Sequence, residues 1–177
     1  LGSLNLTYAY MVDKHKPERE RGISIYNSFT PFESKNHTFT VIDTPGHRDY
    51  IHNMVSATSQ ADVAILIVSA LAGEFEAGIA QEGQTIKHAL VAFALGIKEM
   101  VFCVNKMGSQ YVQWSEAQFN EIKTQLSASL QKIGYDPEKI PFVPISGLRG
   151  DNLTVKIKNK LSLWYQGPCL LEVLDNL

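Results

Sequence analysis

Three short polar segments in the sequence each follow a run of hydrophobic residues directly. They are Asp43-Thr-Pro-Gly46-His47, Asn105-Lys106-Met-Gly108 and Ser146-Gly147-Leu148. A carboxylate such as Asp43 suits Mg²⁺, a hard cation that prefers oxygen ligands, and can hold it through water. The N–H of Gly46 can approach a phosphate closely because no side chain intervenes, and His47 can position an attacking water. Taken alone, the segment is also an ordinary Pro-Gly turn with a surface histidine.

The second segment contains residue types that hold a purine base. Asn105 offers a polar side chain to the base, and the aliphatic stem of Lys106 can lie over it. Guanine-reading sites place an Asp as the fourth residue, where this chain has Gly108. That carboxylate would accept two N–H donors from guanine, a contact of roughly 2 to 3 kcal/mol. We therefore expect weak or undetectable GTP binding and poor discrimination among purines. In the third segment, backbone N–H groups of the Ser146 loop can face a base carbonyl.

The segment "KPERERGISI" alternates in charge, which predicts a solvated stretch of chain. An alternative is a mobile loop that folds over a nucleotide, in which case Ser24 offers its hydroxyl to Mg²⁺. No G-x-x-x-x-G-K-[ST] motif occurs in the sequence, so no residues of this kind cradle the α- and β-phosphates. No H-E-x-x-H or paired Cys-x-x-Cys motif indicates zinc.

The elements that must position these segments alternate between strands and helices. β-rich runs at 22–32 and 37–43 predict a hairpin, and buried strands are predicted at 61–70 and 100–104. A last strand is predicted at 140–146, where two prolines indicate an edge or irregular position. Helices are predicted over 84–96, 115–134 and 168–177, with a short one after residue 47. The apolar run 63–68 is typical of a strand covered on both faces. This order predicts an α/β fold with a mostly parallel sheet flanked by helices, whose ligands bind at the carboxyl ends of the strands, after Ile42, Val104 and Ile145.

The overall composition is that of an ordinary globular chain. It has 177 residues, a net charge of -2 and two cysteines, so it carries no global basic field for nucleic acid. Both thiols are expected to be reduced. No apolar stretch approaches the roughly 20 residues that span a bilayer. The sequence predicts a cytoplasmic monomer with no membrane partner.

The order and wording of the motifs resemble the nucleotide-binding domain of translational GTPases of the elongation factor 1-alpha type. The resemblance rests on "YAYMVDKHKPERERGISI", "DTPGHRDYIHNM", "SQADVAILIVSA", "GEFEAGI", "GQTIKHAL", "VNKM", "FVPISGLRGDN" and "WYQGPCLLEVLD". It implies a P-loop GTPase fold that binds GTP or GDP with Mg²⁺ and hydrolyses GTP. It also implies three partners: the ribosome, aminoacyl-tRNA and a guanine-nucleotide exchange factor.

Carried over by position, the resemblance implies a role for each polar residue. Asp43 and Gly46 belong to the Mg²⁺ and γ-phosphate loop, His47 is the catalytic, water-positioning residue, and Ser24 is a second Mg²⁺ ligand. Base contacts are implied for Asn105, Lys106, Ser146, Gly147 and Leu148.

Several features depart from this family. We expect residues 1–177 to be a single, amino-terminally truncated domain that lacks the first strand, the phosphate loop and the two β-barrel domains. Three alternatives remain open at this point. One is a catalytically inactive relative that acts as a docking module, another is a release-factor or ribosome-rescue relative, and the third is an unstable product with exposed sheet edges.

Overall fold

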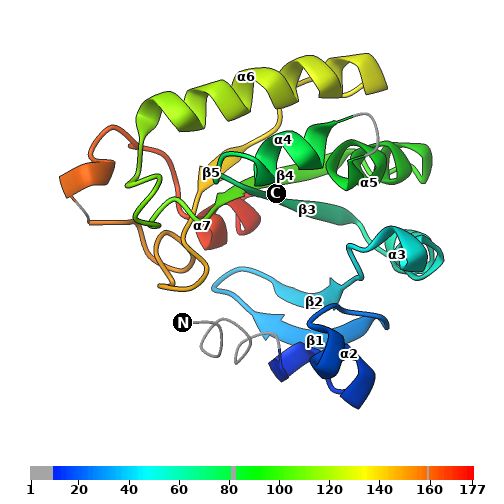
Figure 1. The fold of residues 1–177 in the computed structure, drawn as a ribbon. Helices are drawn as coiled ribbons and strands as arrows, with labels where there is room; N and C mark the ends of the chain where they lie inside the picture. The colour runs from blue at the N-terminus through cyan, green and yellow to red at the C-terminus, as the bar shows by residue number, and fades with distance from the viewer. Residues whose placement is uncertain (1–9, 81–82, 159) are drawn as a thin grey trace. The chain divides into compact units, whose positions relative to one another are not determined.

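The computed structural model describes residues 10–80, 83–158 and 160–177, and the chain divides into two compact units. Unit 1 is Leu1–Ala61 and unit 2 is Asp62–Leu177. Unit 1 contains an antiparallel hairpin and short helices, whereas unit 2 contains a parallel three-stranded sheet with helices on both faces (Figure 1). The predicted α/β fold with a mostly parallel, helix-flanked sheet is confirmed.

The predicted elements occur in the expected order, and the described residues also form helices at Lys16–Arg21, Glu74–Ile79 and Lys160–Ser162 that the sequence patterns did not predict. Unit 1 contains α2 (Lys16–Arg21), β1 (Ser28–Glu33), β2 (Thr38–Asp43), the 3₁₀ helix η1 (Arg48–Tyr50) and α3 (Ile51–Thr58). Unit 2 contains β3 (Val63–Ser69), α4 (Glu74–Ile79), α5 (Gln84–Ala94), β4 (Glu99–Asn105), α6 (Glu116–Ile133), β5 (Phe142–Pro144), the 3₁₀ helix η2 (Lys160–Ser162) and α7 (Leu170–Leu174).

The predicted hairpin is present in unit 1. Strands β1 and β2 pair in antiparallel register from Ser28 opposite Asp43 to Glu33 opposite Thr38. The turn between them is closed by the N–H of Ser34, which donates to the carbonyl of His37 at 2.9 Å. Because Asp43 is the last residue of β2, the polar segment 43–47 begins where a strand ends.

Helix α2 corrects the interpretation of "KPERER" as a merely solvated stretch. Pro17 occupies the first turn, where its missing N–H costs nothing, and Gly22 ends the helix with φ 66°. The side chain of Glu18 is only 2% exposed. Charge alternation alone did not distinguish this buried carboxylate from its exposed neighbours.

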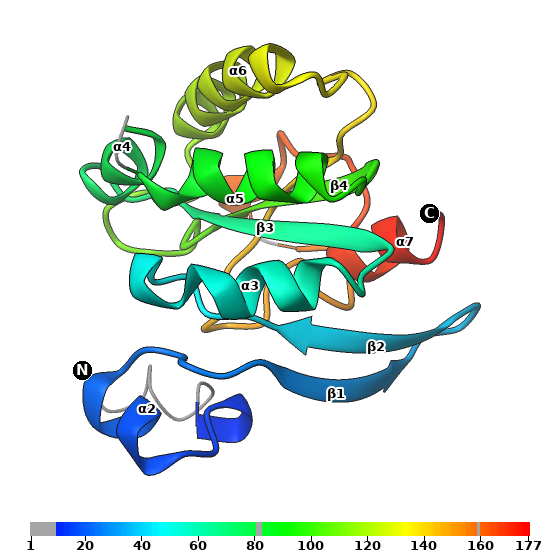
Figure 2. The ribbon, with the colours of Figure 1, turned by 90° about the vertical axis from the view of Figure 1, so that its right-hand side faces the viewer.

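The sheet of unit 2 has the order β3-β4-β5, and all its pairings are parallel. Helices α4, α5 and α6 lie on one face and α7 lies on the other (Figures 1 and 2). The central strand β4 forms the core, with Val101, Phe102, Cys103 and Val104 fully buried. As the prolines around it indicate, β5 is short and pairs only with β4 among the described strands.

Strand β3 is less covered than its apolar sequence predicts. The side chains of Ile65 and Ile67 are 40% and 51% exposed. They pair with Val101 and Cys103 of β4. These two residues belong to a buried cluster that also contains Val143 of β5 and Val173 of α7. In the described chain, the predicted coverage of β3 on both faces is therefore not reached.

The long helix α6 follows its sequence signals. The Ser115 hydroxyl accepts the N–H of Gln118, and Gly134 ends the helix with φ 119°. Phe119, Ile122, Leu126 and Leu130 form its buried face. Within the three described ranges, no helix combines the length and apolar character needed to cross a bilayer.

Candidate functional site

In unit 2, Asn105 links the loops that follow β4 and β5. Its Oδ1 accepts the backbone N–H of Gly147 at 2.9 Å and that of Lys106 at 2.7 Å. The N–H of Met107 donates to the carbonyl of Ile145 at 3.1 Å, which gives the two loops a second connection. The structure therefore brings together the predicted base-contacting residues Asn105, Lys106 and Gly147, as expected from the carboxyl ends of adjacent parallel strands.

Lys106 has a left-handed backbone conformation with φ 66°, unusual for a residue with a side chain. Its Nζ lies 2.5 Å from Oε2 of Glu74, at the start of α4. The hydrogen bonds from Lys106 and Ser69, followed by the charge of Lys106, lower the pKa of the Glu74 carboxyl despite its partial burial. Glu74 was not among the predicted site residues, because its motif "GEFEAGI" carries no chemical signature by itself.

Gly108 is enclosed rather than open. A Cβ at this position would lie 3.0 Å from the Ser146 hydroxyl, 3.2 Å from the Ser146 Cβ and 3.4 Å from Nε1 of Trp114. Trp114 is buried, and its Nε1–H lacks a hydrogen-bond partner within the described residues. A side chain at position 108 would therefore lie next to the unpaired Nε1–H of Trp114. The sequence did not point to Trp114, because a tryptophan there is typical of an apolar core.

The Ser146 loop begins buried and becomes exposed. The N–H of Ser146 donates to the Asp151 carbonyl at 3.2 Å, and the Asp151 N–H returns the bond at 3.2 Å. Ser146 is buried, whereas Gly147 and Leu148 are exposed. Asn105 already accepts the Gly147 N–H, so a base at this loop would contact the remaining groups.

In unit 1, Asp43 lies among other carboxylates. Burial raises the pKa of the Asp43 carboxyl above its usual value, and the negative charges of Asp13 and Glu18 raise it further. Asp13 is itself buried, and its Oδ1 accepts the hydroxyl of Ser24 at 2.7 Å. A divalent cation would relieve this repulsion, so the residues present fit the predicted Mg²⁺ role of Ser24 and Asp43. Asp13 is a member of this group that sequence reasoning missed.

Glu18 holds the residues before Ser24 and after it. Its carboxylate accepts the N–H groups of His15, Ile25 and Tyr26, each at 3.0 Å. Burial raises the pKa of the Glu18 carboxyl, but these three donors outweigh it and the pKa is lowered overall. A single buried carboxylate thus fixes the backbone on which Ser24 is carried.

Gly46 and His47 follow Asp43 at the surface of unit 1. Both residues are exposed, and no atom lies within 4 Å of the position where a Cβ on Gly46 would be. The Nδ1 of His47 accepts the N–H of Asp49 at 3.2 Å and lies 3.6 Å from its carboxylate. This contact orients the ring through Nδ1, and no hydrogen bond to Nε2 occurs in the described part of the chain.

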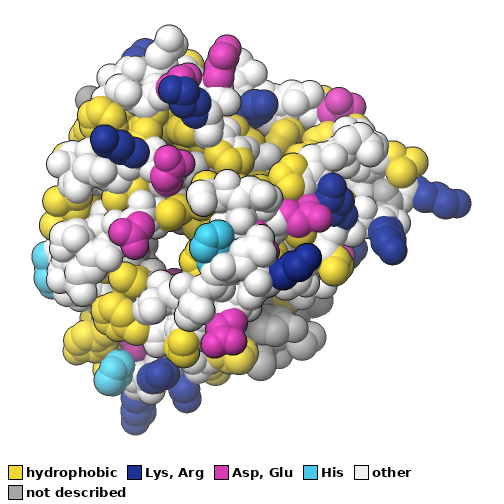
Figure 3. Space-filling model, turned by 180° about the vertical axis from the view of Figure 1, so that it is seen from behind, with side chains coloured by type: hydrophobic (Ala, Val, Ile, Leu, Met, Phe, Trp, Pro, Cys, Tyr) yellow, Lys and Arg dark blue, Asp and Glu magenta, His cyan; other side chains and the backbone are white. Residues whose placement is uncertain are grey.

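The described residues contain no group of three His, Cys, Asp or Glu side chains arranged to hold a metal ion by themselves. Mg²⁺ at Asp43 would accordingly need oxygen ligands from phosphate and water, which this cation readily accepts. On the face seen in Figure 3, basic and acidic side chains are interspersed with hydrophobic ones rather than gathered by sign.

Comparison with known proteins relates the chain to factors of translation. Residues 3–177 match the family described as the elongation factor Tu GTP binding domain. The chain is 53% identical over 176 residues to elongation factor 1-alpha of Tetrahymena pyriformis, covering 99% of this chain and 40% of that protein. The chain therefore spans less than half the length of this relative.

Solved structures agree with the family match. Sup35 complexed with GDP has a TM-score of 0.73 and 35% identity, covering 99% of this chain and 40% of that one. The Ski7 GTPase-like domain of S. cerevisiae, bound to GTP, has a TM-score of 0.79 over 96% of this chain and 38% of that one. Its 23% identity supports the fold alone. The chain belongs to the elongation factor Tu GTP-binding domain family and is an elongation factor 1-alpha-like domain of the translational GTPases.

Proposed function

We propose that this chain binds a guanine nucleotide with Mg²⁺ as part of a cytoplasmic translation factor. The observation that carries the proposal is the Asn105 junction, in which one amide oxygen accepts from both Lys106 and Gly147. This junction leaves the Asn105 amide N–H₂ as a donor for a base and fixes the direction in which the Lys106 stem leaves the loop. The 53% identity to elongation factor 1-alpha supports the same assignment.

Gly108 sets the strength and selectivity that we expect of this site. Without a carboxylate at position 108, the N–H donors of guanine lose an acceptor worth roughly 2 to 3 kcal/mol when charge-assisted. We therefore propose that nucleotide binding is weak, with a dissociation constant above the micromolar range, and that guanine is little preferred over other purines.

For the hydrolytic step, we propose that His47 orients the attacking water. Its contact with Asp49 through Nδ1 leaves Nε2 to hold the water. Asp43 and Ser24 would hold Mg²⁺, which when bound neutralises charge on the phosphates, and the open Gly46 N–H would meet the terminal phosphate. We propose that the full-length factor carries aminoacyl-tRNA to the ribosome. An exchange factor would then replace the bound GDP with GTP.

Titration with a fluorescent GDP analogue tests the binding step on the whole chain. We expect saturable binding that Asn105→Ala abolishes and that Asn120→Ala, an exposed asparagine on α6, leaves unchanged. Absence of saturable binding at millimolar nucleotide would contradict the proposal, and submicromolar binding selective for guanine would contradict the role given to Gly108.

Single-turnover hydrolysis tests His47 separately. We expect His47→Ala to lower the rate of GTP hydrolysis by about 10² to 10⁴ without weakening nucleotide binding. The matched variant is His52→Ala, which removes another exposed histidine of unit 1 and should leave the rate unchanged. Equal rates in the two variants would remove His47 from the mechanism.

A further inference from the structure

The segment 154–163, "TVKIKNKLSL", combines lysines with aliphatic residues and contains no carboxylate. In the surrounding sequence, no acidic residue occurs between Asp151 and Glu172, whereas lysines occupy positions 156, 158 and 160. The whole chain, by contrast, has a net charge of -2. The segment contains none of the nucleotide-binding residues discussed above, so the proposed function gives it no role.

The segment exposes apolar side chains and buries a polar one. Val155, Leu161 and Leu163 are 69%, 57% and 68% exposed. Ser162, which lies between the two leucines in the sequence, is only 2% exposed. Single exposed apolar residues are ordinary in globular proteins, but a buried serine between two exposed leucines reverses the usual arrangement. This reversal is typical of a surface that meets an apolar partner.

Polar contacts hold the segment at both of its ends. Before it, the side chain of Asn152 is 1% exposed; its Nδ2 donates to the Pro144 carbonyl at 2.9 Å, and its Oδ1 accepts the N–H of Ile157 at 3.3 Å. After it, Nε1 of Trp164 donates to the carbonyl of the buried Trp114 at 2.7 Å. The exposed side chains are therefore carried by a segment that is fastened to the core of unit 2 on both sides.

The three lysines of the segment are exposed, but they differ in their ionic partners. Nζ of Lys156 lies 3.6 Å from a carboxylate oxygen of Glu172. No ion pair joins Lys158 or Lys160 to a carboxylate within residues 10–80, 83–158 and 160–177. The segment lies at the left of Figure 1 and hence at the right of Figure 3, where basic side chains project beside hydrophobic ones. Two of the three cations can thus meet an anion without breaking an ion pair of the described residues.

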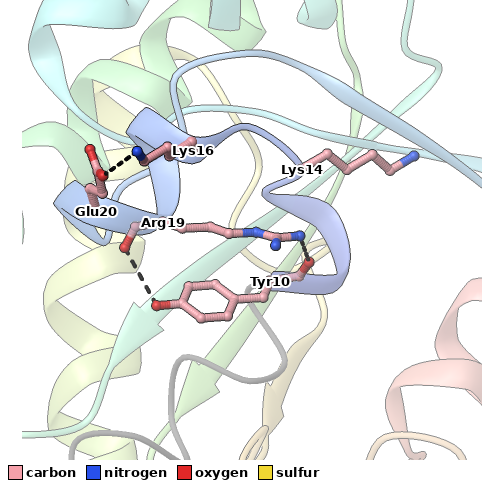
Figure 4. Close-up of a pocket in the computed structure, with 5 residues that line it drawn as sticks. All are labelled: Tyr10, Lys14, Lys16, Arg19 and Glu20. Atoms are coloured by element: carbon pink, nitrogen blue, oxygen red, sulfur yellow. Dashed lines mark hydrogen bonds and ion pairs between the residues drawn. The ribbon is translucent and has the colours of Figure 1, made fainter.

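A hollow of about 500 Å³ in unit 1 offers cations in a different setting. It is lined by Tyr10, Lys14, Lys16, Arg19 and Glu20 (Figure 4). Lys16 lies 3.5 Å from Glu20, and Arg19 donates to the Tyr10 carbonyl at 3.1 Å. No aliphatic side chain among the described residues lines this hollow. Lys14 therefore provides a matched control, because it is an exposed lysine in a surface without aliphatic lining.

We propose that the segment 154–163 lies on the surface of an anionic phospholipid bilayer. Lys158 and Lys160 contact the anionic headgroups, while Val155, Leu161 and Leu163 enter the boundary between headgroups and acyl chains. An acidic polypeptide or a nucleic acid would satisfy the lysines but would leave the leucines in water. The expectation of no membrane partner came from the absence of a spanning stretch, which a contact at the surface does not need. The proposal does not depend on nucleotide binding.

Flotation of the full chain with lipid vesicles tests the contribution of the lysines. The chain should float with phosphatidylcholine vesicles that contain about a third phosphatidylserine, and added salt should weaken this binding. Each lysine near such a surface contributes about fivefold in affinity, so Lys158→Gln and Lys160→Gln should each weaken binding by about that factor. Lys14→Gln makes the same change of charge in the hollow of unit 1 and should leave vesicle binding unchanged.

Leu163→Gln tests the contribution of the aliphatic side chains. It leaves the charge unchanged and removes an apolar side chain that is 68% exposed, so we expect vesicle binding to weaken by about tenfold. The matched control is Leu90→Gln, at a leucine 51% exposed on α5, which should bind vesicles as the parent chain does. Circular dichroism verifies that each variant remains folded. GDP-analogue titration of the same variants should be unchanged, which separates failure of this proposal from failure of the proposed function.

Four outcomes would overturn the proposal. The first is no flotation with phosphatidylserine-containing vesicles at low salt, and the second is equal binding to vesicles of pure phosphatidylcholine. The third is an equal loss in Lys158→Gln and Lys14→Gln. The fourth is unchanged vesicle binding in Leu163→Gln, which would assign the lysines to a soluble polyanion.

Discussion

The two units of this chain hold their functional residues in place by different forces. In unit 2, the loops after β4 and β5 are anchored to a core of fully buried apolar side chains. In unit 1, the buried side chains that surround Ser24 are carboxylates, which act through hydrogen bonds to the hydroxyl and to backbone N–H groups. Apolar burial is insensitive to pH, whereas a buried carboxylate depends on its protonation. The base-contacting residues proposed in unit 2 should therefore keep their arrangement as pH changes, whereas the Mg²⁺-binding residues proposed in unit 1 should respond to pH.

The largest expected effect on stability comes from a substitution in the core of unit 2. Leu126→Ala removes a fully buried side chain from α6, and we expect the free energy of unfolding to fall by about 2 to 5 kcal/mol. The matched variant Leu90→Ala, at a residue 51% exposed on α5, should cost less than about 1 kcal/mol. Chemical denaturation measures both, and similar losses would mean that apolar burial does not distinguish the two positions.

The second prediction concerns the junction between the β4 and β5 loops. Asn105→Ala leaves the N–H groups of Lys106 and Gly147 without their acceptor, and we expect a loss of about 1 to 3 kcal/mol. Asn105→Asp keeps an oxygen acceptor and should retain most of this stability, while losing the amide donor that a base would need. If both variants unfolded at the same denaturant concentration, the junction would not contribute to stability.

The third prediction tests the pH response of unit 1. Because the folded pKa of Glu18 is lowered, its contribution is complete above the unfolded pKa and is lost as pH falls through the folded pKa. Glu18→Gln should cost about 1 to 2 kcal/mol at pH 7 and should remove this acid dependence. Hydrogen exchange of the Ile25 and Tyr26 amides reports the loss directly, and unchanged protection would contradict the role of Glu18.

The smallest expected effect is at Asp43, where a substitution should stabilise the protein rather than destabilise it. Its folded pKa is raised, chiefly by burial and then by Asp13 and Glu18, so its stabilising contribution is present at low pH and is lost as pH rises through the folded pKa. Asp43→Asn should therefore stabilise the metal-free protein at pH 7, by less than about 1 kcal/mol. Thermal denaturation without Mg²⁺ measures the change, and destabilisation would show that the charge is already compensated.

Sequence patterns predicted the elements well where one signal dominated. The period of α6, its Ser115 cap and its Gly134 stop all point to the same helix, and the hairpin has alternating strands around a polar turn. The coverage of β3 could not be predicted, because Ile65 and Ile67 depend on which helix packs over them. Periodicity reports that a residue is apolar, but it does not report what covers it.

The sequence predicted the motif residues of the candidate site, but not the residues that contact them. Motif spacing identified Asn105 and Gly147, which the structure joins by a hydrogen bond. Asp13, Glu74 and Trp114 were missed, since each acts through a neighbour brought close only by folding. The roles in nucleotide and metal binding stay predictions for His47, Asp43 and the residues that accompany them.

The two cysteines of the chain, Cys103 in β4 and Cys169 before α7, are both buried and both lie in unit 2. Burial raises the pKa of the Cys103 thiol to about 12, so it offers almost no thiolate to a reagent while the core is closed. The rate of thiol labelling of the native chain consequently measures how often the core of unit 2 opens. Because unit 1 contains no cysteine, this labelling reports no exposure of its own residues.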